Sequence, residues 1–118
     1  MPAARMRRVN EAVREVVSAH IAGDLKDPRI GFVTVTGVDT SPDLRHARVY
    51  VSVLGGEVER EDAFQGLTSA AGFLQSQVGA ELRMKRTPTL EFVHDPSIDH
   101  GMRMERLISE VAPDENAE

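Results

Sequence analysis

The sequence predicts one α+β domain whose helices cover one face of a small three-stranded sheet. Three observations carry this prediction. The chain has 118 residues, which fits a single domain of the usual size of roughly 100–150 residues. Hydrophobic residues make up 41% of the chain, which is enough for one core. Segments of helical and of strand periodicity follow one another with no internal repeat and no linker.

The first element is expected to be an amphipathic helix over about residues 6–22. Its apolar residues recur at helical spacing between charged ones: Val9, Ala12, Val13, Val16, Val17 and Ile21. Gly23 is a natural end for this helix. A turn is predicted over residues 26–29, because Pro28 fixes φ and disfavours helix at the residue before it.

Two strands are expected next, paired as an antiparallel hairpin. Residues 32–38 are rich in β-branched side chains, and Gly37 predicts a bulge or bend in this strand. Residues 39–43 read Asp-Thr-Ser-Pro-Asp, which predicts a turn. Residues 47–54 alternate between apolar and other side chains and are predicted to form the second strand.

A long helix is predicted after an acidic loop at residues 57–62, whose charge suits the positive end of that helix. Its apolar stripe consists of Phe64, Leu67, Ala71, Leu74, Val78 and Leu82. Gly72 lies within the stripe, although a helix-interior Gly costs about 1 kcal/mol relative to Ala. We therefore expect either a bend at Gly72 or a close approach to its backbone.

The last elements are a strand and a short helix. Pro88 ends the long helix, and residues 89–94 are predicted to form the third strand. Met104, Leu107, Ile108 and Val111 have helical spacing, which predicts a helix over about residues 99–111. Residues 1–111 are thus the expected domain, and residues 112–118 an acidic, flexible tail.

Composition and motifs argue against several classes of function. The chain has no Cys, which excludes disulfide scaffolds, Cys-ligated zinc and thiol catalysis and fits a reducing cytoplasm. No apolar stretch approaches the roughly 20 residues that span a bilayer. Motifs of nucleotide-binding proteins, zinc proteases and serine hydrolases are absent. We therefore expect no catalytic residue, no cofactor, no metal and no membrane association.

One cluster of ionisable residues is a candidate metal or acid–base site. His94 ends the third predicted strand, and Asp95, Asp99 and His100 follow it in the next loop. The plainer alternative is a polar loop, in which Asp95 makes a turn and Asp99 caps the next helix.

The charge distribution is more informative than the net charge of −5. Residues 57–62 carry a net charge of −3 and residues 110–118 carry −4, so the rest of the chain is slightly basic. Basic residues cluster at the N-terminus and again just after the long helix: Arg5, Arg7 and Arg8, then Arg83, Lys85 and Arg86. Such clusters can bind phosphates. The alternative is that they are solvated helix ends, with cations offsetting the dipole after the long helix.

The predicted order helix–strand–strand–helix–helix–strand resembles the type II KH domain. Particular residues are similar to those of the ribosome-binding factor A family of bacterial small-subunit assembly factors, from about residue 5 to residue 108. The matching stretches are Lys26-Asp27-Pro28-Arg29, Val38-Asp39 with Ser41 and Asp43-Leu44, Ala47-Arg48-Val49-Tyr50-Val51, Ala70-Ala71-Gly72-Phe73, Leu82 to Arg86 with Pro88, Leu90-Glu91-Phe92, Asp95, Ser97 and Gly101-Met102-Arg103-Met104.

The resemblance implies a structural role for Gly72 in the helical stripe. No two glycines lie three residues apart, so the G-x-x-G loop of KH domains is absent. The family has an Ala-x-Gly kink instead, which Ala70, Ala71 and Gly72 match. Gln75 departs from the pattern, because the family often has Arg there.

The resemblance implies a monomeric, cytoplasmic and non-catalytic factor. It implies binding to the immature 30S subunit and its 16S rRNA near the decoding region, on the free subunit rather than the 70S ribosome. It also implies a role in late maturation and processing of that RNA, often important in the cold, and release linked to an assembly GTPase. The basic residues expected to contact phosphates are Arg7, Arg8, Arg83, Lys85 and Arg86, with Arg48 and Arg103 as further candidates.

Two alternatives stay open. The chain could be a KH-like protein-interaction module that makes no direct RNA contact and binds its partner through the acidic residues 57–62. The other is a small hydrolase or metal enzyme that uses His94, Asp95 and His100.

Overall fold

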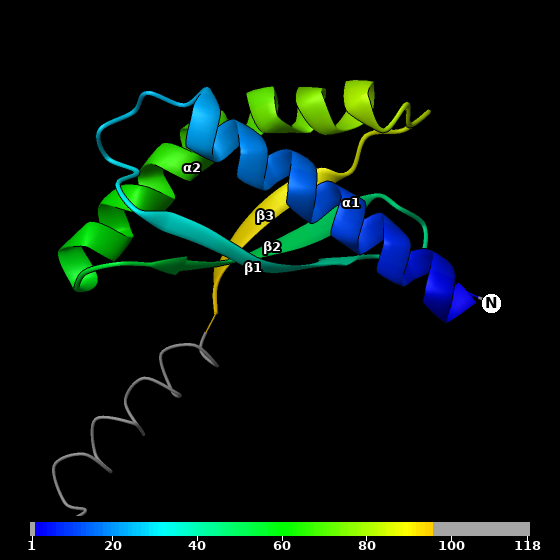
Figure 1. Cartoon of the computed structure of the whole chain (residues 1–118), viewed down its shortest axis with the longest axis horizontal. Coiled ribbons are helices and arrows are strands. Elements are labelled where there is room, and N and C mark those ends of the chain that lie inside the picture. Colours follow the sequence, from blue (N-terminus) through cyan, green and yellow to red (C-terminus); the bar gives the residue numbers. More distant parts are fainter. Residues whose placement is uncertain (1, 96–118) are drawn as a thin grey trace, which may run out of the picture.

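The computed structural model describes residues 2–95, in which two helices lie on one face of a three-stranded sheet (Figure 1). The elements are α1 Pro2–Gly23, β1 Val33–Thr40, β2 His46–Val53, α2 Glu57–Glu81 and β3 Thr89–His94. This confirms the predicted α+β class. The predicted short helix at residues 99–111, the tail at residues 112–118 and the candidate Arg103 lie outside the described residues.

The strands lie in the order β1-β2-β3. β1 and β2 form the predicted antiparallel hairpin, whereas β3 runs parallel to β2 after the chain has crossed the sheet through α2. The pairing of β1 with β2 shifts between Val35 and Gly37, so the predicted bulge is present. Thr36 lies in this bulge, and its hydroxyl donates a hydrogen bond of 3.3 Å to the Tyr50 carbonyl.

The predicted turn at residues 39–43 begins too early. Asp39 and Thr40 still pair with β2, and the connecting loop starts at Ser41. One reason lies outside the hairpin, because the Asn10 side chain on α1 accepts the Thr40 N–H at 2.8 Å. The other is that the Ser41 hydroxyl accepts the His46 N–H at 3.1 Å and so closes the loop after the strand pairing has ended.

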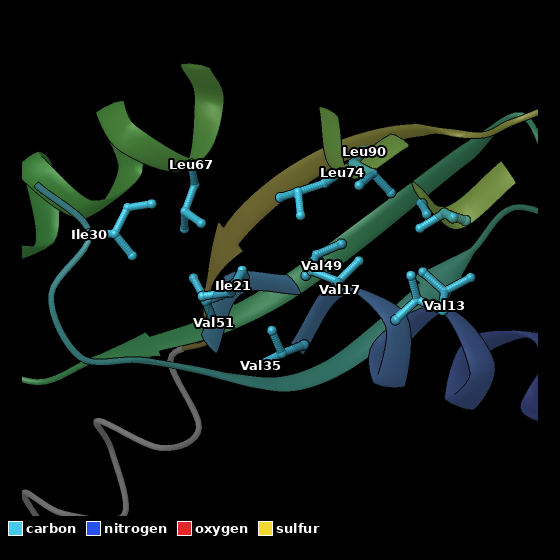
Figure 2. Close-up of a cluster of buried hydrophobic side chains, with 13 residues drawn as sticks. Val13, Val17, Ile21, Ile30, Val35, Val49, Val51, Leu67, Leu74 and Leu90 are labelled. Carbon is cyan, nitrogen blue, oxygen red and sulfur yellow. The ribbon is translucent and has the colours of Figure 1, made fainter. Parts of the chain in front are cut away.

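The core lies between the sheet and the two helices. The side chains that meet there are buried, with relative exposures of 0–9%, and come from every element (Figure 2). They include Val13, Val17 and Ile21 of α1, Val35, Val49, Val51 and Leu90 of the sheet, and Leu67, Leu74 and Val78 of α2. Each such burial stabilises the fold by roughly 1.5–3 kcal/mol, so the apolar stripes read from the sequence hold the layers together.

The acidic segment at residues 57–62 is not a loop before the helix, as predicted, but the beginning of α2. Gly56 is the N-cap, and the Glu59 carboxylate reaches back to accept its N–H at 2.8 Å. This bond lowers the pKa of Glu59. Carboxylates are favoured at the positive end of a helix, so the acids stabilise the helix by forming its first turns.

α2 continues without a break through Ala70, Ala71 and Gly72, although its ribbon changes direction between its two halves (Figure 1). The change of direction agrees with the expected kink, and its origin at Gly72 stays a prediction. A Cβ added at Gly72 would meet no atom within 4 Å, so no described part of the chain packs against this position.

At two other glycines of α2, a loop lies close to the helix backbone. A Cβ at Gly66 would lie 2.7 Å from Ile30, and a Cβ at Gly79 would clash with Thr87. The turn at residues 26–30 is itself rigid, because the Asp27 carboxylate accepts the backbone N–H of Arg29 at 3.0 Å. The bonds from Arg29 lower the pKa of Asp27 to about 2. Both connections are thus fixed onto the helix.

Candidate nucleic-acid interface

The loop after α2 is held by its own backbone. The Arg83 N–H donates to the Ala80 carbonyl at 3.4 Å, and the Met84 N–H donates to the Gly79 carbonyl at 3.0 Å. These two bonds are those of a Schellman motif, which places its C′ residue in the left-handed conformation and usually has Gly there. Here the C′ residue is Arg83, with φ of 52°. The chain therefore has a cation where a glycine would be easier to accommodate.

The hydrogen bonds at this helix end show whether the three cations that follow α2 donate to its carbonyls. The carbonyls of Val78, Gly79 and Ala80 already accept backbone N–H groups. The cationic side chains at residues 83, 85 and 86 are exposed and form no hydrogen bond or ion pair with any other part of residues 2–95. The three cations thus donate to none of these carbonyls and are available to a ligand.

The fold brings this loop next to the N-terminal turns of α1. The two segments line one groove of about 520 Å³, although more than 70 residues separate them in the sequence. The groove is lined by Arg5, Arg8, Val9, Ala12, Asp43, Leu44, Leu82, Arg83, Met84, Lys85 and Arg86. We call it the basic groove, because five cationic side chains and a single carboxylate surround it. Neither Arg5 nor Arg8 forms an ion pair within residues 2–95.

Four of the predicted phosphate contacts thus share one site: Arg8, Arg83, Lys85 and Arg86. Arg7 is exposed on α1 but does not line the groove. Sequence reasoning did not select Arg5, although its spacing of three from Arg8 places both on the same side of a helix. That spacing is the signal that could have identified it.

Arg48 lies elsewhere. It projects from β2 on the sheet face that the helices leave open, between Asp39 of β1 and Glu91 of β3 in the strand register. Its guanidinium lies 3.8 Å from the Glu91 carboxylate. Two neighbouring carboxylates offset its charge, which makes it a weaker phosphate ligand than the cations of the basic groove.

The acidic residues lie at the other end of the domain. Figure 1 shows that the start of α2 and the N-terminal end of α1 are at opposite ends of the described fold. Glu57, Glu59, Glu61 and Asp62 are all exposed on that first part of α2. The fold therefore places the acidic residues 57–62 far from the basic groove.

The candidate metal or acid–base cluster is not assembled in the described part of the chain. Within residues 2–95, no three His or acidic side chains could hold a metal ion together. Asp95 instead accepts a hydrogen bond of 2.5 Å from the Thr36 hydroxyl and thereby braces the bulge of β1. Asp99 and His100 lie outside the described residues.

His20 joins the C-terminal ends of the two helices. Its Nε2 contacts the Glu81 carboxylate and its Nδ1 contacts the Asp24 carboxylate. The Glu81 carboxylate, followed by that of Asp24, raises the pKa of His20. The imidazole also meets the ring of Phe73 edge-on, with 5.8 Å between the ring centroids. His20 is therefore a link between α1 and α2.

Gln75, where the related family often has Arg, has a structural contact. Its Oε1 accepts the Leu90 N–H at 3.0 Å and so ties α2 to β3.

Neither described helix combines the length and the apolar character that a membrane span requires.

Comparisons with known proteins agree on one family. The family model described as "Ribosome-binding factor A" matches residues 5–108. A protein of that name from Anaeromyxobacter sp. (strain K) is 55% identical over 107 residues, which cover 90% of this chain and 78% of the relative. The crystal structure of ribosome-binding factor A from Thermus thermophilus is similar with a TM-score of 0.68 and 29% identity, over 75% of this chain and 94% of that chain.

A third similarity concerns a ribosome complex. A homology model of Thermus thermophilus ribosome-binding factor A has been fitted into a cryo-EM map of a 30S complex of that protein. Its TM-score is 0.60 at 31% identity, over 71% of this chain and 88% of that chain.

Proposed function

The chain belongs to the ribosome-binding factor A family, and on that premise we propose that it is a non-catalytic assembly factor that binds the immature 30S subunit through its 16S rRNA. We further propose that it assists late maturation and processing of that RNA. The relative fitted into a 30S complex supports the choice of subunit. Binding to free subunits rather than 70S ribosomes, a monomeric state in the cytoplasm, importance in the cold and release linked to an assembly GTPase belong to the same proposal.

The observation that carries the proposal is the basic groove. Two cation clusters that are far apart in the sequence converge on one concave surface, and none of their side chains is neutralised within residues 2–95. Lys and Arg side chains bind RNA by displacing counterions from phosphates, which depends on local rather than net charge. The net charge of −5 is thus compatible with RNA binding through this end of the domain.

The chain contains a matched pair of residues for a test, because it has only two lysines. Lys85 lines the basic groove, whereas Lys26 is exposed in the turn before β1. Lys85→Glu should weaken binding to purified small subunits by about tenfold or more, which corresponds to at least about 1.4 kcal/mol. Lys26→Glu makes the same change of charge and should leave the affinity within about twofold. Equal affinities for the two variants in a co-sedimentation assay would refute the assignment of the groove.

The processing role needs a separate measurement in cells. Cells that lack the protein should accumulate unprocessed 16S rRNA precursor, and the wild-type gene should restore mature ends. A normal ratio of precursor to mature RNA, in the cold as well as at the ordinary growth temperature, would contradict this part of the proposal.

A protein-interaction module without direct RNA contact is the second candidate. Large apolar side chains are exposed near the acidic start of α2, with relative exposures of 78% for Phe32, 68% for Leu54 and 67% for Val58. Such residues beside carboxylates suit a basic protein partner. On this alternative, Val58→Ser would abolish binding to small subunits and Lys85→Glu would not.

A further inference from the structure

We infer that the basic groove holds one unpaired nucleotide of RNA, with its base on the apolar floor of the groove and its phosphates on the basic rim. This inference rests on the proposed function, which it deepens by naming the form of RNA that the site selects.

The floor of the groove is apolar and open to solvent. Its five apolar residues are all half-buried, so each offers part of its surface to a ligand: Val9, Ala12, Leu44, Leu82 and Met84. A site that bound only phosphates would need cations and hydrogen-bond donors but no such surface. Half-buried apolar side chains beside exposed cations match a ligand that has a flat, weakly polar part and a charged part. A nucleotide has both.

The size and shape of the groove favour an unpaired nucleotide over a duplex. Its volume of about 520 Å³ lies within the range of roughly 300–1,000 Å³ that is usual for small-molecule sites. A duplex is convex and keeps its bases stacked inside, so proteins contact it mainly through phosphates and 2′-hydroxyls. Only a base that has left the stack could reach the floor.

The stacking partners in this groove would be guanidinium planes and a thioether rather than aromatic rings. Among residues 2–95, no aromatic side chain lines the groove. Bases in single-stranded RNA also stack on Arg guanidinium planes, and the groove has four arginines: Arg5, Arg8, Arg83 and Arg86. Met84 lies among the floor residues, and its flexible, polarizable side chain adapts to different surfaces. These groups favour an unstacked base without selecting a particular one.

The backbone of the loop presents Arg83 at a conformational cost. A left-handed conformation is uncommon for residues other than Gly, and such positions tend to occur at functional sites. The Schellman motif fixes this conformation and thereby the direction in which the Arg83 side chain leaves the helix end. The backbone of Arg83 is thus fixed before any ligand arrives, so that binding needs no further ordering of the loop backbone.

The test uses the full chain and two RNA hairpins that differ only in one unpaired 2-aminopurine nucleotide in the stem. We expect wild-type protein to bind the bulged hairpin at least fivefold more tightly than the fully paired one and to change the 2-aminopurine fluorescence. Met84→Ser should remove this preference while leaving the salt dependence of binding unchanged. Val58→Ser makes a comparable change outside the groove and should retain the preference.

A second variant of the floor provides an independent test in case Met84→Ser does not fold. Leu44 has φ of 61°, a conformation that Asn tolerates, so Leu44→Asn removes apolar surface from the floor without adding backbone strain. It too should lose the preference for the bulged hairpin. Equal wild-type affinities for the two hairpins, or a preference that survives both floor variants, would overturn the inference. The proposed function would stand in that case if wild-type protein still bound small subunits and Lys85→Glu still weakened that binding.

Discussion

Helix α2 begins with four carboxylates among its first six residues and is followed by three cations directly after its last turn. Both arrangements complement the helix dipole. At the acidic end this physics accounts for what is seen, because Glu59 accepts the N-cap N–H and the other acids are exposed on the first turns. At the basic end the dipole does not account for everything, because the carbonyls of Val78, Gly79 and Ala80 accept backbone N–H groups and the cations form no hydrogen bond with the helix.

The basic end also has features that the acidic end lacks. A second element, α1, contributes Arg5 and Arg8, an apolar floor lies between the cations, and Arg83 occupies a position that suits Gly. The comparison teaches that charge at a helix end indicates a ligand site only when something beyond the dipole is needed to explain it.

The largest expected effect is on binding. Replacing Arg83, Lys85 and Arg86 together with Glu should lower the affinity for small subunits by at least about 100-fold, since each hydrogen bond to a charged group contributes roughly 1.5–3 kcal/mol. The far-UV circular dichroism and the unfolding temperature should change little, because all three side chains are exposed. An affinity within a few-fold of wild type at physiological salt would place the site elsewhere.

The glycines of α2 should respond in opposite directions. Gly79→Ala should destabilise the fold by about 1–3 kcal/mol, because the new Cβ would clash with Thr87 and displace the loop. Gly72→Ala meets no described atom and should stabilise the helix by up to about 1 kcal/mol, unless the bend requires Gly. Denaturant unfolding measures both. A Gly79→Ala variant as stable as wild type would show that the loop is not held as described.

A smaller effect on stability should separate folding from function at Arg83. Arg83→Gly removes the steric cost of the left-handed conformation but raises the conformational entropy of the unfolded chain. The free energy of unfolding should therefore rise by between zero and about 1 kcal/mol. Binding to small subunits should nevertheless weaken by several-fold. If binding were retained, the Arg83 side chain would have no role in binding RNA, and its left-handed conformation would be unrelated to function.

The smallest expected effect is on the pH dependence of stability and concerns the contact of His20 with Glu81, the last residue of α2. The raised pKa of His20 means that protonation stabilises the folded chain. This contribution is complete below the unfolded pKa of roughly 6.5 and is lost as the pH rises through the folded pKa. For such a partly exposed pair we expect about 0.2–1 kcal/mol. His20→Gln should remove this part of the pH dependence of the free energy of unfolding, and an unchanged pH profile would contradict the contact.

Local patterns were enough to predict most of the fold. The strand at residues 89–94 and the bulge at Gly37 follow from period and residue type. The errors occurred where a distant contact or a cap decides the boundary. Asn10 of α1 prolongs β1 to Thr40, and the Glu59 carboxylate starts α2 at Glu57. The Asn10 contact has no signature in the local sequence, whereas Glu59 has the spacing of a capping box but follows Gly56 rather than the usual Ser or Thr.

The candidate site was only half predictable. The cations after α2 are visible as a cluster in the sequence, but their convergence with Arg5 and Arg8 is not. It depends on the parallel pairing of β2 with β3 and on how α1 lies across the sheet, which no spacing encodes. The pairing of β2 with both neighbouring strands explains why Arg48, a plausible phosphate ligand in the sequence, lies between two carboxylates instead.

The salt dependence of binding tests most directly whether the basic groove contacts RNA phosphates. The logarithm of the binding constant should fall linearly with the logarithm of salt, at roughly 0.7–0.9 per phosphate contact. Five engaged cations predict a slope of about −3.5 to −4.5 for wild-type protein with purified small subunits. The triple variant at residues 83, 85 and 86 should have a slope shallower by about 2–3. A flat wild-type response, or a slope that the triple variant leaves unchanged, would contradict the account.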